Sequence, residues 1–365
     1  MRILHIDTER TWRGGERQAY WLARELAGRG HRIWMACRPG YPLASRCREA
    51  SLDVIPISPI SEVDPFAALR LRRFCRENDV EVLHAHTGVA VGLAALASLG
   101  TDLLLVGTRR VDFPLRNGWF TRWKYGRLDA LAVISRKVGD VVRQAGLPEE
   151  RLRLIPSGTD HSGSPDASQR DCLRRSRGLA AEDQIVVHAG ALVPHKDQAA
   201  LLRAARIVCD ALPSVRFLIL GEGPLMTSLK SLAGDLNLAG NVFFLGHRSD
   251  VGEYIALADV FVMSSAEEGL GTVLLDAMNA GVPTAATSAG GIPDLYGEEW
   301  ESLLSTPGRP GDLADSILRI LGDESEAQHR VEHGHRRAAF FTVSEMTTRY
   351  ESLYSTLSVL PHAGR

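Results

Sequence analysis

Short apolar runs alternate with helical segments along nearly the whole chain. Strand-like runs stand at Ile3–Ile6 and Arg32–Ala36, with an expected helix between them at Arg17–Ala27. Later strand-like runs lie at Val82–His84, Leu103–Val106 and Ala130–Val133. Strands that alternate with helices pair in parallel and are covered by the helices that connect them. The amino-terminal part is therefore predicted to be an α/β domain with a parallel sheet.

This alternation is interrupted once and then begins again. Residues 161–177, which follow the segment Ile155–Asp160, lack apolar periodicity and are rich in arginine. A second series of strand-like runs follows at Ile185–His188, Val215–Leu220, Val242–Leu245 and Val260–Met263. The 365 residues exceed one ordinary core and suit two domains of about 150 to 180 residues. We expect one domain at 1–160, a linker at 161–177 and a second Rossmann-like domain at 178–340.

Composition and charge argue against several classes of protein. The net charge of -2 argues against bulk binding to nucleic acid. The five cysteines are scattered and form no C-x-x-C pair, so neither a disulfide framework nor a zinc site is indicated. The chain opens on a strand-like run without a signal peptide, and no apolar stretch reaches about 18 residues. We therefore expect a soluble, cytoplasmic protein.

The most informative segment joins a strand, a glycine-rich loop and a helix. The apolar run Val260–Met263 is followed by a turn in which Gly269 allows close approach, and helical spacing starts at Thr272, a candidate cap. The first N–H groups of a helix lack internal partners and carry the positive end of its dipole, which stabilises an anion such as a diphosphate. Glu268 and Asp276 flank this position and can accept hydrogen bonds from sugar and ribose hydroxyls. Alternatively, Glu268 only caps the helix and Asp276 is a solvated charge.

This segment resembles the donor motif of the family-4 retaining glycosyltransferases, which have the GT-B fold. The motif places a Glu, seven residues and a second Glu in a phrase such as E-G-F-G-x-x-x-x-E-A-M. This chain has Glu268-Gly269-Leu270-Gly271 and then Asp276-Ala277-Met278. The segments 281–283 and 290–294 also resemble the family. The resemblance implies two Rossmann-like domains whose parallel sheets face across a cleft, and a nucleoside-diphosphate sugar as donor.

The resemblance also implies roles for the residues of the motif. Glu268 would hold hydroxyls of the donor sugar, and the amides of Leu270 and Gly271 would face the sugar or the phosphate. Asp276 would hold the ribose. Because Asp276 stands where the family has Glu, its arm is shorter by one methylene, and a contact through water is an alternative.

Lys196 and several glycine-rich segments complete the implied donor site. Lys196 lies in a segment similar to the family phrase G-R-L-x-x-x-K-G and matches the lysine that neutralises the diphosphate. The arginine of that phrase is Ala191 here, so one phosphate clamp is missing. His195 or Arg248 can replace it, although an exposed loop residue is the other interpretation of His195. The remaining donor-binding residues implied by the resemblance are Gly14, Gly15, Glu222, His247, Arg248 and Thr272.

Two of these glycine segments have alternative interpretations. Gly14 and Gly15 follow the first strand, where any tight connection to a helix can use glycine. Glu222 lies in a cluster that suggests nicotinamide binding, but Pro224 and Leu225 break the G-x-G-x-x-G pattern. We expect no cofactor, since the nucleotide sugar is a substrate, and the resemblance implies no metal.

The amino-terminal domain is expected to bind the acceptor. Many family members place a histidine close to the reacting sugar where this chain has Arg110. An arginine cannot act as a general base, but Arg109 or Arg110 can hold an anionic acceptor or steady the leaving phosphate. Surface ion pairing is the alternative. His84 and His86 stand in a segment that resembles the family's H-A-H, and either can line the cleft or be buried and hydrogen-bonded.

Two basic stretches, 70–76 and 116–125, raise the question of a membrane. The second combines aromatic and cationic residues, as an interfacial helix does, but half-buried helices on a Rossmann sheet have the same pattern. A lipid-linked acceptor would favour peripheral contact with the inner face of the cytoplasmic membrane. The terminal segment 341–365 resembles the family's final helix, which returns to the first domain.

These observations lead to one main hypothesis and two alternatives. The main hypothesis is a retaining, metal-independent glycosyltransferase that moves a sugar to a hydroxyl of a glycan or lipid-linked acceptor, in cell-envelope polysaccharide or lipopolysaccharide biosynthesis. Its candidate catalytic residues are Glu268, Lys196 and Arg110. A non-catalytic nucleotide-sugar-binding or scaffold protein is suggested by Ala191 and Arg110, and a GT-B sugar-nucleotide epimerase is the other alternative.

Overall fold

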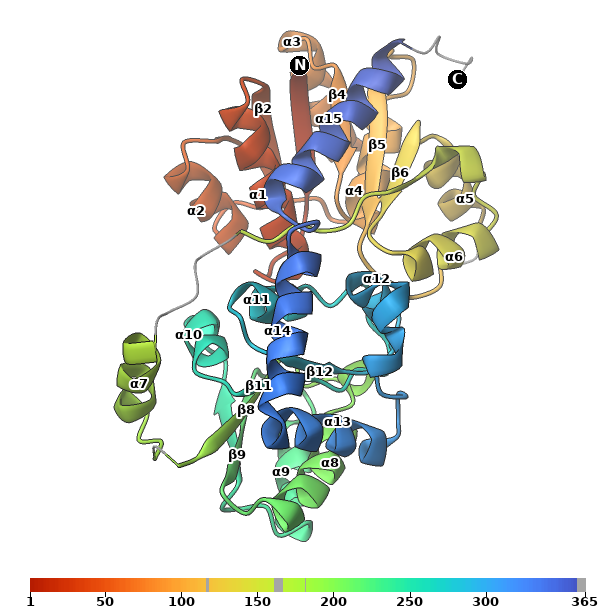
Figure 1. The fold of residues 1–365 in the computed structure, drawn as a ribbon. Helices are drawn as coiled ribbons and strands as arrows, with labels where there is room; N and C mark the ends of the chain where they lie inside the picture. Colours follow the sequence, from red (N-terminus) through yellow and green to blue (C-terminus); the bar gives the residue numbers. More distant parts are fainter. Residues whose placement is uncertain (116–117, 161–166, 181, 360–365) are drawn as a thin grey trace. The chain divides into compact units, whose positions relative to one another are not determined.

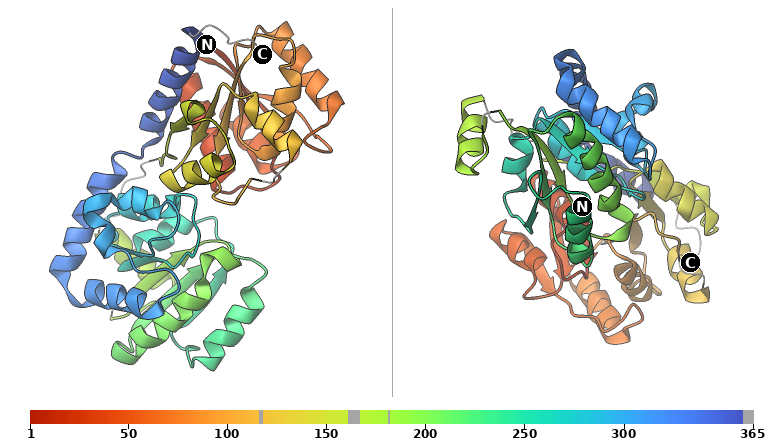
Figure 2. Two further views of the ribbon diagram at one scale, coloured as in Figure 1. Left: turned by 90° about the vertical axis from the view of Figure 1, so that its right-hand side faces the viewer. Right: turned by 90° about the horizontal axis from the view of Figure 1, so that it is seen from below.

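The computed structural model describes residues 1–115, 118–160, 167–180 and 182–359. The chain divides into two compact units, one made of Met1–Gly158 with Thr342–Arg365 and the other of Thr159–Phe341 (Figure 1). Each unit contains one parallel sheet with helices on both faces (Figures 1 and 2).

Seven parallel strands form the sheet of the first unit in the order β3-β2-β1-β4-β5-β6-β7. Their bounds are β1 (Arg2–Asp7), β2 (Arg32–Cys37), β3 (Asp53–Pro56), β4 (Val82–Ala85), β5 (Leu104–Arg109), β6 (Ala130–Val133) and β7 (Leu152–Leu154). Along β1, every residue after the first is buried, as expected for a strand covered on both faces.

The helices of the first unit lie on both faces of this sheet. On one face, α1, α2 and α15 share a hydrophobic core with the strands, and α3, α4 and α5 pack together on the other (Figure 2). The elements are α1 (Gly14–Gly28), α2 (Pro42–Glu49), α3 (Pro65–Glu77), α4 (Gly88–Ala97), α5 (Trp119–Gly126), α6 (Arg136–Gln144), the 3-10 turn η1 (Glu149–Arg151) and α15 (Val343–Val359). In α1, Ala19, Leu22, Ala23 and Leu26 are buried at helical spacing, which explains why this sequence forms a helix against the sheet.

Five parallel strands form the sheet of the second unit in the order β10-β9-β8-β11-β12. Their bounds are β8 (Gln184–Ala189), β9 (Val215–Leu220), β10 (Val242–Gly246), β11 (Val260–Met263) and β12 (Thr284–Ala286). Residues of α8, α9 and α13 build the main hydrophobic core on one face. The helical elements are α7 (Ala167–Ser176), η2 (Pro194–Lys196), α8 (Gln198–Ala211), α9 (Met226–Asp235), α10 (Val251–Ala256), α11 (Thr272–Asn279), α12 (Ile292–Tyr296), η3 (Glu298–Leu303), α13 (Pro310–Gly322) and α14 (Glu324–Ala338).

The order of the strands creates one switch point in each sheet. β1 lies between β2 and β4, so the loops that follow β1 and β4 leave the sheet in different directions; β8 lies between β9 and β11 in the same way. In open α/β sheets, ligands bind outside the carboxyl ends of strands at such points. The candidate residues are therefore sought in the loops after β1 and β4 and after β8 and β11.

The structure confirms the predicted α/β class and corrects one local prediction. Thr272 is the first helical residue rather than the cap, because Gly271 occupies the cap position with a φ of 86°, which favours glycine. Part of the expected linker is helical, since Ala167–Ser176 forms α7. Residues 161–166 of that linker and residues 116–117 of the second basic stretch lie outside the described residues.

Candidate active site

The loops after β8 and β11 bring Lys196 and Glu268 together. The Lys196 ammonium donates to Glu268 Oε2, and the two side chains are only 18% and 14% exposed. Their positions lie 72 residues apart in the chain, so the pair forms only because β8 and β11 are neighbours in the sheet. The structure thus places the two main candidate residues of the second unit at its switch point.

Side-chain and backbone groups of the two loops hold this pair in place. Buried Ser264 donates to the Lys196 carbonyl at 3.0 Å, and buried Ser265 contacts Glu268 Oε2 at 3.4 Å. The carbonyl of His195 accepts from the N–H groups of Ala266 and Glu267. His195 therefore joins the two loops through its backbone.

The glycines after β11 and β12 allow close backbone approach. A Cβ on Gly290 would lie 1.9 Å from the Glu268 carbonyl oxygen, which also accepts from the Gly291 N–H at 2.8 Å. Gly269 and Leu270 are buried. The loop that carries Glu268 is therefore packed tightly against the loop that precedes α12.

Helix α11 starts directly after this loop, so the N–H groups of its first turn face the loop. Thr272, partly exposed, opens the helix, and Asp276 lies one turn further, also partly exposed. The positive end of the helix dipole thus lies beside Glu268 and Lys196, an arrangement that stabilises an anion.

A second glycine segment packs against the loop after β8. A Cβ on Gly221 would lie 1.9 Å from the Gly190 carbonyl oxygen. Glu222 Oε1 accepts from the His247 N–H at 3.3 Å. Arg248 is paired in the described structure, with Asp250 at 2.7 Å, so its guanidinium is already engaged.

In the first unit, Gly14 and Gly15 form the start of α1, after β1. Glu16 Oε2 accepts from the Arg13 N–H at 2.6 Å and closes this helix end. A Cβ added to Gly15 would meet no atom within 4 Å. Packing within the protein therefore does not explain a glycine at this position.

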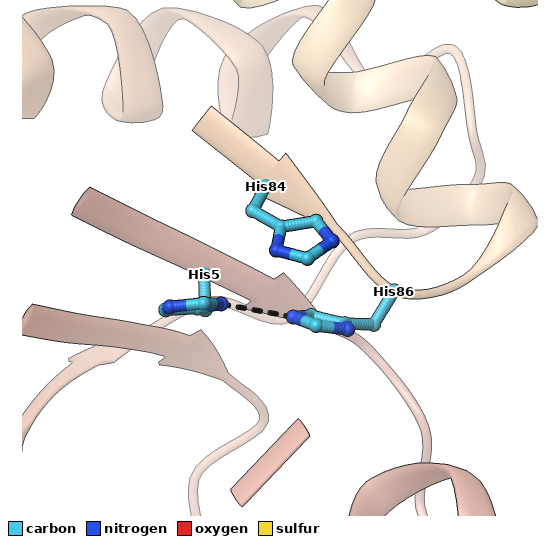
Figure 3. Close-up of side chains that lie close together, drawn as sticks. All are labelled: His5, His84 and His86. Atoms are coloured by element: carbon cyan, nitrogen blue, oxygen red, sulfur yellow. Dashed lines mark hydrogen bonds between the residues drawn. The ribbon is translucent and has the colours of Figure 1, made fainter. Parts of the chain in front are cut away.

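The loops after β4 and β5 place Arg110 beside His86. Arg110 Nη1 lies 3.2 Å from His86 Nδ1. The other ring nitrogen of His86, Nε2, lies 2.9 Å from His5 Nδ1 (Figure 3). His84, the neighbour of these rings, bonds Tyr354 and Thr108, both at 2.7 Å. Both histidines considered from the sequence are buried and hydrogen-bonded at both ring nitrogens, but His86 is the one that contacts Arg110.

Burial keeps these histidines neutral. Desolvation, with Arg110 as a further cause, lowers the pKa of His5 to about 3. Desolvation also holds the pKa of His84 and His86 well below the usual range. Asp7, buried at the end of β1, has its pKa raised to about 7, chiefly by desolvation. The Arg110 guanidinium thus faces neutral imidazoles.

Arg109 has a different environment from Arg110. It is buried at the end of β5, and its guanidinium donates to the Phe113 carbonyl. Arg109 therefore shapes the turn after β5, whereas Arg110 is the more accessible of the two guanidinium groups.

Comparison with known families covers both units of the chain. Residues 12–162 match the family described as Glycosyltransferase Family 4, and residues 169–337 match the one described as Glycosyl transferases group 1. A Mycobacterium tuberculosis GDP-mannose-dependent alpha-(1-6)-phosphatidylinositol monomannoside mannosyltransferase is 31% identical over 283 residues, 72% of each chain. This chain belongs to glycosyltransferase family 4.

Other relatives and solved structures cover the chain more fully. The Bacillus anthracis N-acetyl-alpha-D-glucosaminyl L-malate synthase is 23% identical over 91% of each chain. The Anabaena protein HepE, solved in complex with UDP, has a TM-score of 0.86 at 22% identity over 99% of this chain and 100% of its own. HepE has also been solved with UDP-glucose. The chain is therefore a glycosyltransferase with the GT-B fold.

The sequence analysis did not identify several residues that lie around these candidate residues. His188, buried on β8, binds the Val262 carbonyl at 3.0 Å and Gln198 at 3.3 Å, and burial lowers its pKa to about 4. Ser264 and Ser265 support Lys196 and Glu268, and His5 supports His86. An inward-facing polar residue on a predicted buried strand, such as His5 or His188, is the signal that could have identified them.

Proposed function

We propose that this family-4 enzyme transfers a sugar from a nucleoside-diphosphate sugar to a hydroxyl of a glycan or lipid-linked acceptor, with retention at the anomeric carbon and without a required metal. The observation that carries the proposal is the Lys196–Glu268 pair beside the start of α11. It offers a cation and a helix dipole for a diphosphate next to a carboxylate for sugar hydroxyls. The UDP and UDP-glucose complexes of HepE support this class of donor.

In the proposed reaction, the acceptor oxygen bonds to the anomeric carbon as the bond from that carbon to the diphosphate oxygen breaks. The acceptor proton passes to the departing phosphate on the same face of the sugar. Lys196 and the N–H groups at the start of α11 stabilise the charge that grows on the diphosphate. Glu268 accepts hydrogen bonds from the sugar hydroxyls, and Asp276 accepts them from the ribose. The donor contacts replace the ion pair between Lys196 and Glu268.

Arg110 is the proposed residue on the acceptor side, with Arg109 and His86 near it. A guanidinium suits an anionic acceptor or the leaving phosphate, because it stays charged and donates in a fork. The named substrates of relatives include a phosphatidylinositol monomannoside and L-malate, which supports an anionic acceptor. We place the reaction in the synthesis of cell-envelope polysaccharide or lipopolysaccharide, in the cytoplasm.

The experiment that tests the proposed reaction compares wild type with Glu268→Gln in a transfer assay. A hydrogen bond to a charged group contributes about 1.5 to 3 kcal/mol, so turnover should fall roughly 10- to 150-fold while the affinity for nucleotide changes little. Glu267→Gln, at the exposed neighbouring position, is the matched control. The product's anomeric configuration, read by NMR, tests retention; activity that persists after treatment with EDTA supports the absence of a required metal.

Two results would contradict the proposal. Donor that is bound but never consumed with any acceptor would indicate the binding or scaffold protein. Donor that is converted without any acceptor would indicate an epimerase.

We further propose that the first unit contacts the membrane. Ile60, Phe66 and Trp119 are 96%, 84% and 80% exposed, in the loop before α3, at the start of α3 and at the start of α5. Arg70 and Arg73 are exposed on α3. Exposed apolar side chains beside arginines suit an anionic bilayer surface. Among the described residues, no helix is both long and apolar enough to cross a bilayer.

Sedimentation with vesicles tests this contact. Wild type should bind vesicles that contain phosphatidylglycerol more strongly than vesicles of phosphatidylcholine alone, and the double variant Ile60→Ser, Phe66→Ser should lose most of that binding. Phe340→Ser, which changes an apolar side chain 60% exposed in the second unit, is the control. Equal binding by the wild type and the double variant would contradict the proposal.

A further inference from the structure

His86 lies between two partners in the first unit and contacts each with a different ring nitrogen. Its Nδ1 lies 3.2 Å from Arg110 Nη1, and its Nε2 lies 2.9 Å from His5 Nδ1. His5 comes from β1 and His86 from the loop after β4, and their rings are stacked (Figure 3). The three side chains thus form a hydrogen-bonded chain that starts at a permanent cation and ends at a fully buried imidazole.

Arg110 sets the direction of every bond in this chain. A guanidinium only donates, so His86 Nδ1 must accept. A neutral imidazole has one N–H, which His86 must then carry on Nε2 and donate to His5 Nδ1. His5 in turn carries its own proton on Nε2. Burial keeps both rings neutral, as the lowered pKa of each indicates.

The last group of this hydrogen-bonded chain, the Nε2–H of His5, is left by these bond directions without a partner in the described part of the protein. Among the described residues, His5 Nε2 has no hydrogen-bond partner, although it is buried. Leaving a buried N–H unpaired is unfavourable. If Arg110 did not need an acceptor, His5 could donate from Nδ1 to His86 Nε2 and leave a lone pair, rather than a proton, at Nε2. The arrangement is therefore the one that holds Arg110.

The same hydrogen-bond directions disfavour a metal centre. Ligand nitrogens of His5, His84 and His86 all lie within 4.8 Å of one another. Binding an ion through His86 Nε2 would move the proton to Nδ1, where it would face the N–H groups of Arg110. A metal-bound imidazole instead needs an acceptor on its other nitrogen. Both ring nitrogens of His84 are also hydrogen-bonded, one to Tyr354 and the other to Thr108.

We propose that His86 is a positioning residue that holds the Arg110 guanidinium at the carboxyl edge of the first sheet, and that His5 fixes the tautomer that His86 needs for this task. The importance of Arg110 to the reaction rests on the proposed function. The hydrogen-bond directions do not rest on it, because they follow from the contacts alone.

NMR of protein labelled with ¹⁵N-histidine tests the tautomers directly. The variants His5→Gln, His84→Gln and His86→Gln assign the signals in long-range ¹H–¹⁵N spectra. Between pH 5.5 and 8, these spectra should show that the rings of His5 and His86 are neutral and that each carries its single proton on Nε2. The titratable and charged groups around this chain are Asp7 on β1, His84 on β4, Arg110, and Tyr350 and Tyr354 on α15. A proton on His86 Nδ1 in the wild type would overturn the proposal.

Substitution of Arg110 tests whether its guanidinium sets the tautomers of His86 and His5. In Arg110→Met the acceptor is no longer required, so His5 should move toward the Nδ1–H tautomer, whereas Arg110→Lys, which retains a donor, should preserve the wild-type spectrum. An unchanged spectrum in Arg110→Met would overturn the proposal.

Titration with Zn²⁺ should leave the three histidine signals in place; one equivalent that shifts all three would establish a metal site instead.

Kinetics test the consequence for the reaction. Glutamine can accept from Arg110 and donate to His5, whereas leucine can do neither, so His86→Leu should lower kcat/KM for the acceptor about tenfold and His86→Gln should restore most of it. The KM for the donor should stay constant, and equal melting temperatures would show that both variants fold. Equal losses in both variants would contradict positioning. A wild type without transferase activity would refute the proposed function and leave the NMR result intact.

Discussion

At the scale of single residues, the central feature is a partly buried ion pair that joins two loops distant in sequence. Lys196 and Glu268 neutralise each other, and Ser264 and Ser265 hold the surrounding loops. Removing one partner of a buried pair leaves a charge without compensation, whereas removing both does not. The pair therefore keeps both groups in place.

A double-mutant cycle measures this coupling. Lys196→Met and Glu268→Gln should each lower the free energy of unfolding by about 1 to 3 kcal/mol, and the double variant should lose less than the sum of the two, because no charge is left unpaired. Urea unfolding of the four proteins gives the interaction energy. Strictly additive losses would show that the pair is not coupled in the folded protein.

The motif made Glu268 and Lys196 visible in the sequence, because both lie at fixed positions in recognisable segments. Their supporting residues were not visible. His188 and His5 lie on strands whose apolar neighbours set the pattern, and their partners are 74 and 81 residues away. Only the strand order brings such partners together, so single-sequence patterns do not contain this information. Donor binding by Arg248 stays a prediction; its guanidinium pairs with Asp250, a near neighbour in the sequence.

At the scale of elements, strands and helices were predictable where apolar spacing was regular, as in β1, α1 and β11. The errors have local causes. Thr272 has a hydroxyl suited to capping, but Gly271 takes the left-handed cap position and leaves Thr272 inside the helix. Helix α7 has mostly polar and basic residues, so it gave no apolar period from which a helix could be predicted.

The start of α1 offers a test of a glycine that packing does not explain. Gly15→Ala should fold at least as stably as wild type, since the added methyl meets open space and alanine favours a helix by up to about 1 kcal/mol. If donor or acceptor approaches this backbone, the variant should lose catalytic efficiency about tenfold or more. The melting temperature and kcat/KM together distinguish a loss of stability from a loss of catalysis. Unchanged kcat/KM would remove Gly15 from the site.

At the scale of the whole molecule, both units place polar groups on buried strands at their switch points. The resulting set of buried neutral histidines makes stability depend on pH. Burial lowers the pKa of His5 to about 3 and that of His188 to about 4. It also lowers the pKa of His333, which lies on helix α14 rather than on a strand, to about 4. Each of these groups is protonated near pH 6.5 when the chain unfolds. Asp7, whose pKa is raised to about 7, acts in the opposite direction.

The sign of the effect follows from proton binding. Below pH 6.5 the unfolded chain binds more protons than the folded one, so the free energy of unfolding should fall as pH decreases toward 4, by up to about 1.4 kcal/mol per pH unit for each buried histidine. Between pH 4 and 7, the raised pKa of Asp7 offsets the contribution of one buried histidine to this slope. Urea unfolding at pH 5.0, 6.0, 7.0 and 8.0 measures the slope, and His188→Phe should reduce it between pH 5.0 and 6.0. A slope of zero below pH 6.5 would contradict this account.

Binding of a donor to the edge formed by β8 and β11 is the first property of this protein to measure. Thermal shift of the wild type against UDP-, GDP-, ADP- and dTDP-sugars should single out one nucleotide, because a ligand at 100 times its Kd adds about 2.7 kcal/mol of stability. Asp276→Ala should lose most of that shift, while Asp235→Ala, an exposed carboxylate at the end of α9, should keep it. If no nucleotide sugar stabilised the wild type, or if Asp276→Ala responded as fully as wild type, this edge would not be the donor site.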